Sequence, residues 1–472
     1  MFSENPIAQA QTPEGVTSMC DKALTRARQL QDEIRELASA EKSALTWETT
    51  FGAFDEIARA VGEALQVPQL MMVAHPDADV RQAAMACEPK VNAFTSALFM
   101  DDQIEVTLKH FADRATETSP VHLRFMEHVL RDYRRNGLSL DPNGREELRL
   151  LNERITMVGQ QFEKHLAENT RWIEIVPEQL AGLPVFYVAN HPTNEQGKIR
   201  ITTDYPDFVP FMRYAHDRQA ARALHVESHN RTAKENLPLL DQLIELRHKK
   251  AKLLGYPTWA DYVLETRMAK SAINVKRFLE DLHIAIKQKR EEEFILFREA
   301  GVSMGIPNGE PMFSSDTSYL EEIICKKQFQ LDSQRVSEYF EILNVLKGIF
   351  EMTKRLYGLS FERTQITTWH QDVQAFDVQE TSGEIIGRAY LDLYPRDQKY
   401  KHAAVFGLRD TLRQADGARV LPIAALVCNF SKPGASPALL SHEEVTTFFH
   451  EFGHLLHHLV STCELASFSG TN

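Results

Sequence analysis

Cysteine is scarce in this chain of 472 residues, and its few cysteines form no recognisable pattern. The five cysteines are widely scattered: Cys20, Cys87, Cys325, Cys428 and Cys463. An odd number without any C-x-x-C pair argues against a disulfide framework and against a thiolate zinc site. A reducing compartment is the simplest expectation, so the sequence predicts a cytoplasmic protein.

Long apolar runs and an export signal are also missing. No stretch approaches the ~18 consecutive apolar residues that a membrane-spanning helix needs. The beginning of the chain, MFSENPIAQAQTPEG, contains no basic segment followed by an apolar core. We therefore expect neither a membrane-spanning segment nor a secretory signal.

Positive charge is in deficit, because 53 basic residues stand against 66 acidic ones, for a net charge of −13. Such a surface repels phosphate backbones, so nucleic acid is not expected as a partner. The composition is otherwise that of a globular protein, with 43% hydrophobic and 25% charged residues, and it excludes a fibrous or mostly disordered chain. The length suits about three domains or one large two-lobed enzyme.

Helical periodicity dominates what is present. The apolar residues from Leu148 to Leu166 recur every three or four positions and draw a single stripe along one helix. Similar stripes predict five further helices, at residues 20–38, 121–133, 237–254, 275–299 and 336–356.

Strand signals are sparse. Alternating or apolar runs next to turn residues predict two hairpins and one further strand. The hairpins pair 185–189 with 198–202 and 373–378 with 385–393, and the last strand is 423–430. The sequence therefore predicts a mainly α protein whose small β-sheet comes just before the last helix.

The last helix carries the chemistry. Ser441 and Glu444 form an S-x-x-E capping box, which predicts a helix that begins near His442. His450 and His454 then fall one turn apart, so both imidazoles can reach one ion at the Zn–N distance of about 2.0–2.1 Å. The expected apolar side of this helix comprises Val445, Phe448, Phe449, Phe452, Leu455, Leu456 and Leu459.

Glu451 lies between the two histidines, so residues 450–454 read H-E-x-x-H. A bound zinc ion lowers the pKa of its water to about 7, and a neighbouring carboxylate can take that proton and pass it to the leaving amine. This pattern predicts His450 and His454 as zinc ligands and Glu451 as the general base. The competing hypothesis is a surface helix whose histidines are merely solvated.

Two imidazoles leave the rest of the coordination open. His457 lies on the ligand face but a full turn too far along, which favours a hydrogen-bonding role, and Glu464 lies beyond the expected end of the helix. A different H-E-x-x-H enzyme could take its third ligand from upstream. The candidates for that role are His370, His402 and His442.

The motif in its context, His450-Glu451-Phe452-Gly453-His454-Leu455-Leu456-His457, resembles the M3 family of zinc peptidases, the thimet oligopeptidase, neurolysin and oligopeptidase A type. Five other stretches are similar to that family: LLGY with ADYVL at 253–264, MAK at 268–270, YLDLYPR at 390–396, CNFSKP at 428–433 and FSGTN at 468–472. The resemblance covers most of residues 200–472, and before that it rests on helical character and length.

This resemblance implies a zincin-like, two-lobed helical metallopeptidase of the cytosol, a hydrolase with one zinc ion per chain. The lobes would be residues 1–205 and an M3-type catalytic lobe at 206–472. Between them a narrow channel would admit short unstructured peptides and exclude folded proteins. By residue match, His450 and His454 carry over as zinc ligands and Glu451 as the general base.

The chain departs from the family pattern at its end. The family's third ligand is a glutamate on the next helix, which would fall past Asn472. We therefore expect a catalytic lobe that is incomplete at its C-terminus, and impaired activity of the chain as it stands. The alternative is a non-catalytic helical protein that binds peptides or acts as a scaffold and retains a partial metal site.

Overall fold

A computed structural model describes residues 5–41, 44–114, 119–307, 309, 311–414, 417–434 and 437–471. Backbone contacts group the chain into two compact units. Unit 1 comprises Met1–Glu153, Leu343–Phe430 and Thr446–Asn472, and unit 2 comprises Arg154–Ile342 and Ser431–Val445. The two lobes expected at residues 1–205 and 206–472 stay a prediction.

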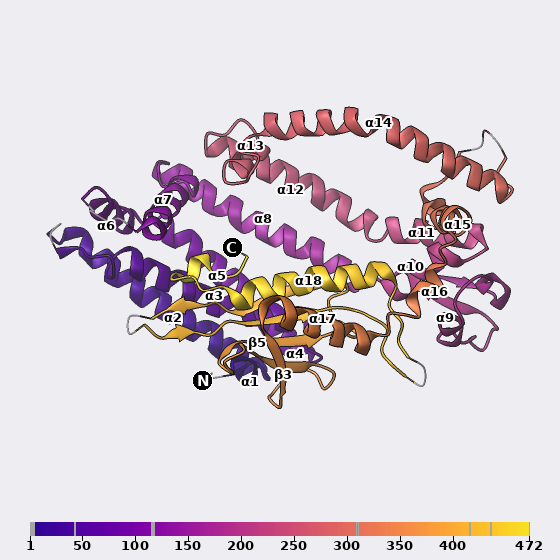
Figure 1. Cartoon of the computed structure of the whole chain (residues 1–472). Coiled ribbons are helices and arrows are strands. Elements are labelled where there is room, and N and C mark those ends of the chain that lie inside the picture. The colour runs from indigo at the N-terminus through magenta and orange to yellow at the C-terminus, as the bar shows by residue number, and fades with distance from the viewer. Residues whose placement is uncertain are drawn as a thin grey trace. The chain divides into compact units, whose positions relative to one another are not determined.

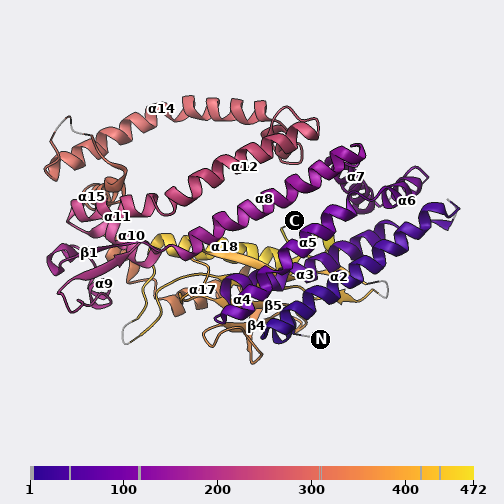
Figure 2. The same ribbon diagram turned by 180° about the vertical axis from the view of Figure 1, so that it is seen from behind.

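The helices of unit 1 begin where capping residues place them. In the second helix Thr12 accepts a hydrogen bond from the amide of Gly15, and Pro13 takes the first helical position, where its missing N–H costs nothing. This helix and the one at 51–74 run side by side (Figures 1 and 2). The helices are α1 (Pro6–Gln9), α2 (Pro13–Glu36), α3 (Phe51–Ala74), α4 (Ala78–Met85), α5 (Cys87–Leu98), α6 (Asp102–Ala112), α7 (Pro120–Arg135), α8 (Pro142–Glu168, continuing into unit 2), α17 (Ile342–Tyr357) and α18 (His442–Val460, beginning in unit 2). The helices predicted at 20–38, 121–133 and 148–166 are confirmed as α2, α7 and α8.

A five-stranded sheet lies in unit 1, in the order β3-β4-β5-β9-β6. All its pairs are antiparallel except the parallel pair of β5 with β9. Its strands are β3 (Ser360–Thr364), β4 (Gln374–Gln379), β5 (Ile385–Asp392), β6 (Ala404–Arg409) and β9 (Ile423–Val427), and a separate small ladder joins β7 (Leu412–Arg413) to β8 (Arg419–Val420). The hairpin predicted at 373–378 and 385–393 is confirmed as β4 and β5, and the strand predicted at 423–430 is confirmed as β9.

The hairpin predicted at 185–189 and 198–202 is wrong. Residues 185–189 form a short helix, because Pro184 begins a helical turn whose carbonyl accepts from the amides of Tyr187 and Val188. The strand at 199–202 instead pairs with an upstream strand, Trp172 lying opposite Thr202. A short apolar run cannot be assigned to helix or strand by periodicity alone, which explains the error.

Unit 2 is otherwise helical. Its remaining elements are β1 (Trp172–Ile175), α9 (Val185–Ala189), β2 (Ile199–Thr202), α10 (Tyr205–Tyr214), α11 (Arg218–His229), α12 (Ala233–Leu253), α13 (Trp259–Leu264), α14 (Ala272–Ser303), α15 (Thr317–Phe329) and α16 (Ser333–Ser337). The helices predicted at 237–254 and 275–299 are confirmed as α12 and α14. The helix predicted at 336–356 is in fact two, α16 and α17, because Glu341 forms a β-bridge with Leu439 between them.

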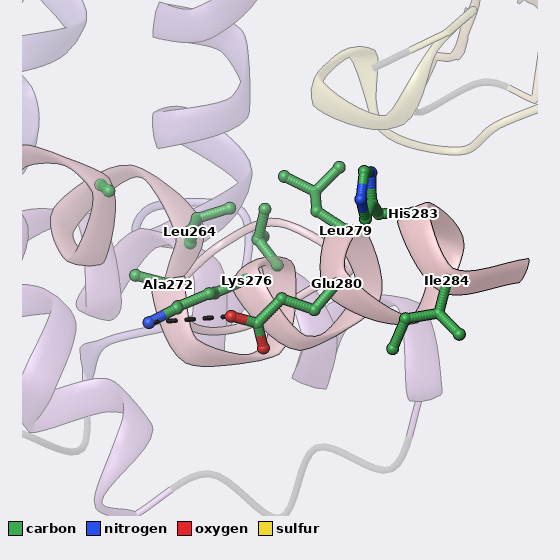
Figure 3. A pocket seen from close by; sticks show the side chains of 9 residues that line it. Leu264, Ala272, Lys276, Leu279, Glu280, His283 and Ile284 are labelled. Atoms are coloured by element: carbon green, nitrogen blue, oxygen red, sulfur yellow. Dashed lines mark ion pairs between the residues drawn. The ribbon is translucent and has the colours of Figure 1, made fainter. Parts of the chain in front are cut away.

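The helix α14 buries little of its apolar stripe. Among its described residues only Ala300 and Gly301 are buried, whereas Ile284 is 72% exposed. An apolar hollow of about 690 Å³ lies between α13 and α14, and Figure 3 shows Leu279 and Ile284 among its lining residues. Within the described residues, no helix is long and apolar enough to cross a membrane.

Candidate active site

The helix α18 begins at the capping box that the sequence predicts. The Ser441 hydroxyl accepts a hydrogen bond from the Glu444 amide at 3.1 Å, and the Glu444 carboxylate accepts one from the Ser441 amide at 2.7 Å. Burial raises the pKa of the Glu444 carboxyl above its ordinary value, although the amide of Ser441 works in the opposite direction. The prediction of a helix that begins near His442 is confirmed.

One side of α18 packs into the core of unit 1. Phe448, Phe452, Leu455 and Leu459 are buried, and the ring of Phe452 lies 5.4 Å from that of Phe361 in β3. Phe449, which the sequence assigned to the apolar side, is instead 37% exposed. The buried side fixes how the helix is turned, and therefore which residues face outward.

His450 and His454 lie on the exposed side. Their Nε2 atoms are 3.2 Å apart, and the two rings are nearly perpendicular, at 87°. Two nitrogens bound to one tetrahedral zinc ion, each at about 2.0–2.1 Å, would lie about 3.3 Å apart. The chemistry and the separation of these two donors therefore fit a zinc ion, although an N–H···N hydrogen bond between the rings has the same length.

Glu451 is half-buried beside this pair. In the part of the chain that the structure describes, its carboxylate makes no hydrogen bond or ion pair, so it is available to take a proton. Apart from the neighbouring residues and backbone of its own helix, a Cβ atom added at Gly453 would meet no atom within 4 Å. The space beside the motif is thus open rather than filled by a neighbouring backbone.

A third ligand does not join the two histidines within the described residues, where no group of three His, Cys, Asp or Glu side chains could hold a metal ion. His370 lies in a loop, where its Nδ1 accepts from the Asp372 amide at 3.2 Å. The other candidates, His402, His442 and Glu464, are likewise not gathered around the pair. The assignment of His450 and His454 as zinc ligands stays a prediction, and Asn472 lies outside the described residues.

The histidine that makes the buried hydrogen bond is His458 rather than His457. The ring of His457 is exposed, whereas the Nε2 atom of His458 lies 3.0 Å from the carbonyl oxygen of Arg409. A Cβ atom at Gly470, whose φ is +66°, would come within 2.5 Å of the His458 ring. Sequence reasoning missed His458, although its position three residues after Leu455 places it on the buried stripe.

The far end of α18 is held by side chains from other elements of unit 1. Arg419 of β8 donates to the carbonyl oxygens of Leu459, at 3.5 Å, and Ser461. A cation at this position satisfies carbonyls that have no partner within the helix and suits its negative end. Asp55 of α3 accepts a hydrogen bond from the Ala466 amide at 2.8 Å. Both ends of the motif helix are therefore fixed.

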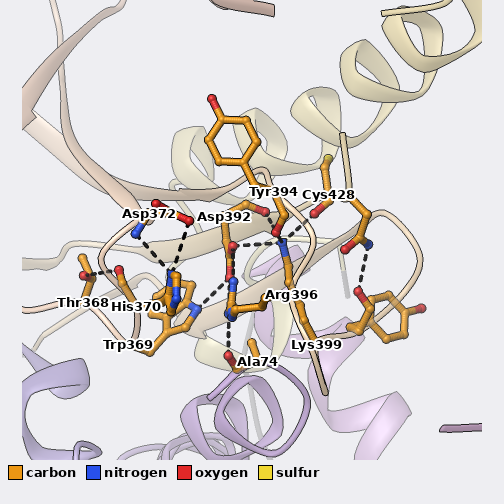
Figure 4. Close-up of polar contacts among 12 residues, drawn as sticks. Ala74, Thr368, Trp369, His370, Asp372, Asp392, Tyr394, Arg396, Lys399 and Cys428 are labelled. Atoms are coloured by element: carbon orange, nitrogen blue, oxygen red, sulfur yellow. Dashed lines mark hydrogen bonds and ion pairs between the residues drawn. The ribbon is translucent and has the colours of Figure 1, made fainter. Parts of the chain in front are cut away.

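A buried charge cluster holds the strands that lead to α18 (Figure 4). The Asp392 carboxylate, at the end of β5, accepts from Trp369 at 2.8 Å and pairs with Arg396 at 2.7 Å and Lys399 at 2.9 Å. Burial opposes its ionisation, but Arg396 and Lys399 outweigh it and hold the pKa of Asp392 below its ordinary value. Lys399 also donates to the carbonyl oxygen of Cys428, which ties β5 to the segment after β9.

Fold and site together define a mainly helical, zincin-like chain in which a metallopeptidase-type H-E-x-x-H helix packs on a small mixed sheet. The sequence model of peptidase family M3 matches residues 211–472, more than half of the chain. The chain belongs to this family.

Curated relatives match over most of the chain. It is 29% identical to the thimet-like oligopeptidase of Dictyostelium discoideum over 457 residues, 93% of this chain and 68% of the relative. It is 30% identical to saccharolysin of Saccharomyces cerevisiae, over 86% of this chain and 60% of that protein. It is 27% identical to oligopeptidase A of Escherichia coli, over 97% and 69% respectively. The chain thus spans between 56% and 69% of the length of these relatives and of the probable thimet oligopeptidase of Arabidopsis thaliana.

Proposed function

We propose that this protein is a zinc-dependent endopeptidase that hydrolyses short oligopeptides, with one zinc ion per chain. The observation that carries the proposal is the pair of Nε2 atoms of His450 and His454, 3.2 Å apart, on the helix that carries Glu451 between them in the sequence. Membership of peptidase family M3 and relatives named oligopeptidases support the same reaction class.

The residues of the motif would have different roles in catalysis. When bound, a divalent zinc ion acidifies a water molecule and polarises the carbonyl of the scissile peptide bond. His450 and His454 would hold the ion through Nε2. Glu451 would take a proton from the attacking water and deliver it to the nitrogen of the leaving amine, so that the C–N bond breaks without release of an amide anion.

Short unstructured peptides are the proposed substrates, and the cytoplasm is the proposed compartment. The exposed side of α18 gives an extended peptide access to the histidine pair. The oligopeptidase names of the relatives point to the same substrate class. All five cysteines are free thiols, which suits a reducing compartment.

A second candidate function is peptide binding without catalysis. The number of metal donors favours this candidate, because within the described residues His450 and His454 are joined by no third His, Cys, Asp or Glu side chain. Two imidazoles suit several divalent ions and fix no single geometry. This candidate predicts that the chain binds an oligopeptide but leaves it intact.

The test is hydrolysis of a quenched fluorescent peptide of about ten residues. We expect activity that a chelator removes and zinc restores, and a fall of about 10²–10⁴-fold in Glu451→Gln. Glu299→Gln, an exposed carboxylate on α14, is the matched control and should keep the activity. Activity that survives both chelation and Glu451→Gln would exclude the mechanism, and binding without cleavage would favour the second candidate.

A further inference from the structure

A groove in unit 1 lies apart from the histidine pair, between α17 and β3. It has a volume of about 370 Å³. Its floor is aromatic: the rings of Phe350 and Phe361 stack 4.5 Å apart, at an interplanar angle of 2°, and Phe376 completes it. Figure 1 shows α17 alongside the sheet that contributes β3. Phe350 and Phe361 are half-buried, so part of this apolar surface stays open to whatever enters the groove.

The rim of the groove is basic. Lys347 and Lys354 of α17 and Arg363 of β3 are exposed and line it, together with one carboxylate, Glu351. The lining therefore has a net charge of about +2, whereas the chain as a whole has −13. In the described part of the chain, none of the three cations has an ion-pair partner. They are charges without a counterpart on a protein of the opposite sign.

The outer side of β3 adds a third feature. The strand order places β3 at the edge of the five-stranded sheet, paired on one side with β4. An edge strand presents backbone N–H and C=O groups that can pair with an added strand. Among the described residues no strand pairs with that outer side.

We propose that this groove docks an extended acidic peptide segment that carries apolar side chains. Its carboxylates would meet Lys347, Lys354 and Arg363, its apolar side chains would rest on Phe350, and its backbone would add to β3. Phe361 and Arg363 are two positions apart on β3 and therefore lie on the same face of the sheet, so the acidic and apolar side chains that meet the rim and the floor must also share one face of the added strand, at every second position.

Charge decides among the possible occupants. A basic segment would meet a basic rim. A second copy that joined β3 to β3 across a two-fold axis would bring the net positive charge of one groove against that of the other. An acidic segment is the occupant that the rim attracts.

The docking site is distinct from the candidate active site. Its floor touches the buried side of α18, because Phe452 lies 6.2 Å from Phe350 and 5.4 Å from Phe361. His450 and His454 lie on the exposed side of the same helix. Occupation of the groove should therefore leave the histidine pair open, and the inference does not depend on the metal chemistry.

The experiment measures fluorescence anisotropy of a labelled peptide of about eight residues, with Glu and Leu in turn at every second position and Thr between them, added to the full chain carrying Glu451→Gln in the presence of a chelator. We expect saturable binding that weakens with salt, and no binding of the peptide with Lys in place of Glu. The double variant Lys347→Glu with Arg363→Glu should weaken binding about tenfold or more. Lys287→Glu with Arg290→Glu on α14 makes the same change in net charge and should bind as the parent does.

Each other outcome overturns the proposal. An equal loss in the α14 control would show a response to net charge alone, and unchanged binding in the groove variant would place the peptide elsewhere. If an unlabelled neutral oligopeptide displaced the labelled peptide, the binding site would lie on the side of α18 that carries His450 and His454. Self-association that the groove variant abolishes would make a second copy the occupant. Lys347→Gln with Arg363→Gln, together with thermal unfolding, separates loss of binding from loss of folding.

Discussion

Two histidine pairs with the same spacing behave differently in this chain. His450 and His454 of α18 meet at their edges, Nε2 to Nε2, at 3.2 Å and 87°. His225 and His229 of α11 lie flat against each other, with ring centroids 3.8 Å apart and planes 18° apart. A shared ion needs converging nitrogens, so the first pair fits a metal ion and the stacked pair does not.

The neighbours of each pair explain the difference. In α11 the Nδ1 atom of His229 lies 2.9 Å from the carbonyl oxygen of His225, and the Nε2 atom of His225 lies 3.4 Å from the Ser314 hydroxyl. The acidic residue between them, Glu227, pairs with Arg171 at 3.1 Å. In α18 the carboxylate of Glu451 is left available. The spacing of two histidines alone therefore does not make a metal site. The ring nitrogens must also converge, and the carboxylate between the histidines must be unpaired.

The largest expected effect is on zinc affinity. His450→Ala removes one of two imidazole donors, so we expect the dissociation constant for zinc to rise by about 100-fold or more, beyond the loss typical of residues that only support a ligand. His229→Ala should leave it unchanged. Competition with a chromophoric chelator measures both. An equal loss of zinc affinity in the two variants would contradict the view that only the pair on α18 binds the ion.

The next effect concerns the end of α18. Arg419→Gln removes a half-buried cation that donates to the carbonyl oxygens of Leu459 and Ser461. A hydrogen bond of this charged kind contributes about 1.5–3 kcal/mol. Because the contact with Leu459 is long, at 3.5 Å, the free energy of unfolding should fall by about the value of one such bond. Urea unfolding followed by circular dichroism measures it. Arg277→Gln, on the exposed face of α14, is the control and should stay within about 0.5 kcal/mol of the parent.

In α11 the comparable end is capped by Asn230, whose backbone amide and side-chain amide donate to the carbonyl oxygen of Val226 at 3.0 and 2.8 Å. Asn230→Ala keeps the first of these bonds and removes only an exposed bond from an uncharged donor. Asn230→Ala should therefore destabilise the chain less than Arg419→Gln does. A larger loss at Asn230 would contradict the view that α18 is the more firmly anchored of the two helices.

The sequence predicted α18 well because its signals are local. The capping box, the apolar stripe and the H-E-x-x-H motif lie within twenty residues of one another, so periodicity and side-chain chemistry suffice. The orientation of His450 and His454 could not be predicted, because it depends on Phe452 and its partners in β3 and α17, far away in sequence. The same holds for His458, whose partner is the carbonyl oxygen of Arg409.

The errors have one local cause and one distant cause. Residues 185–189 became a helix because of the carbonyl of Pro184, and the true partner of the strand at 199–202 is Trp172–Ile175, which was not predicted. The apolar stripe on α14 correctly predicted a helix, but the stripe is largely not buried, since Ile284 is 72% exposed. An apolar stripe predicts a helix but does not say what covers it.

A smaller effect tests the starts of the two helices. Ser441→Ala removes the hydroxyl that accepts from the Glu444 amide, and Asp217→Ala removes the carboxylate that accepts from the Ala220 amide at 2.9 Å at the start of α11. Each should cost about 1 kcal/mol in urea unfolding, as N-cap substitutions do. If either variant loses nothing, its helix does not depend on the cap seen in the structure.

The smallest effect separates these two caps by pH. The amide of Ala220, and next the side chain of Gln179, lower the pKa of Asp217. The Asp217 carboxylate therefore stabilises the folded chain fully above its ordinary pKa of 3.8. This stabilisation is lost as the pH falls through the lowered pKa of Asp217 in the folded state. Burial raises the pKa of Glu444. The Glu444 carboxyl therefore stabilises the folded chain fully below its ordinary pKa of 4.5, and this stabilisation is lost as the pH rises through the raised pKa of the folded state.

Asp217→Asn should thus lower the free energy of unfolding by only a few tenths of a kcal/mol near pH 7, because asparagine also caps helices well. The difference should vanish once the pH falls below the lowered pKa of Asp217 in the folded state. Glu444→Gln should leave it unchanged or raise it near pH 7, because glutamine carries no charge to bury. Urea unfolding at several pH values, with the parent chain as reference, measures both differences. A loss near pH 7 in Glu444→Gln as large as that in Asp217→Asn would mean that the ionised carboxylate stabilises α18, contrary to the direction of its pKa.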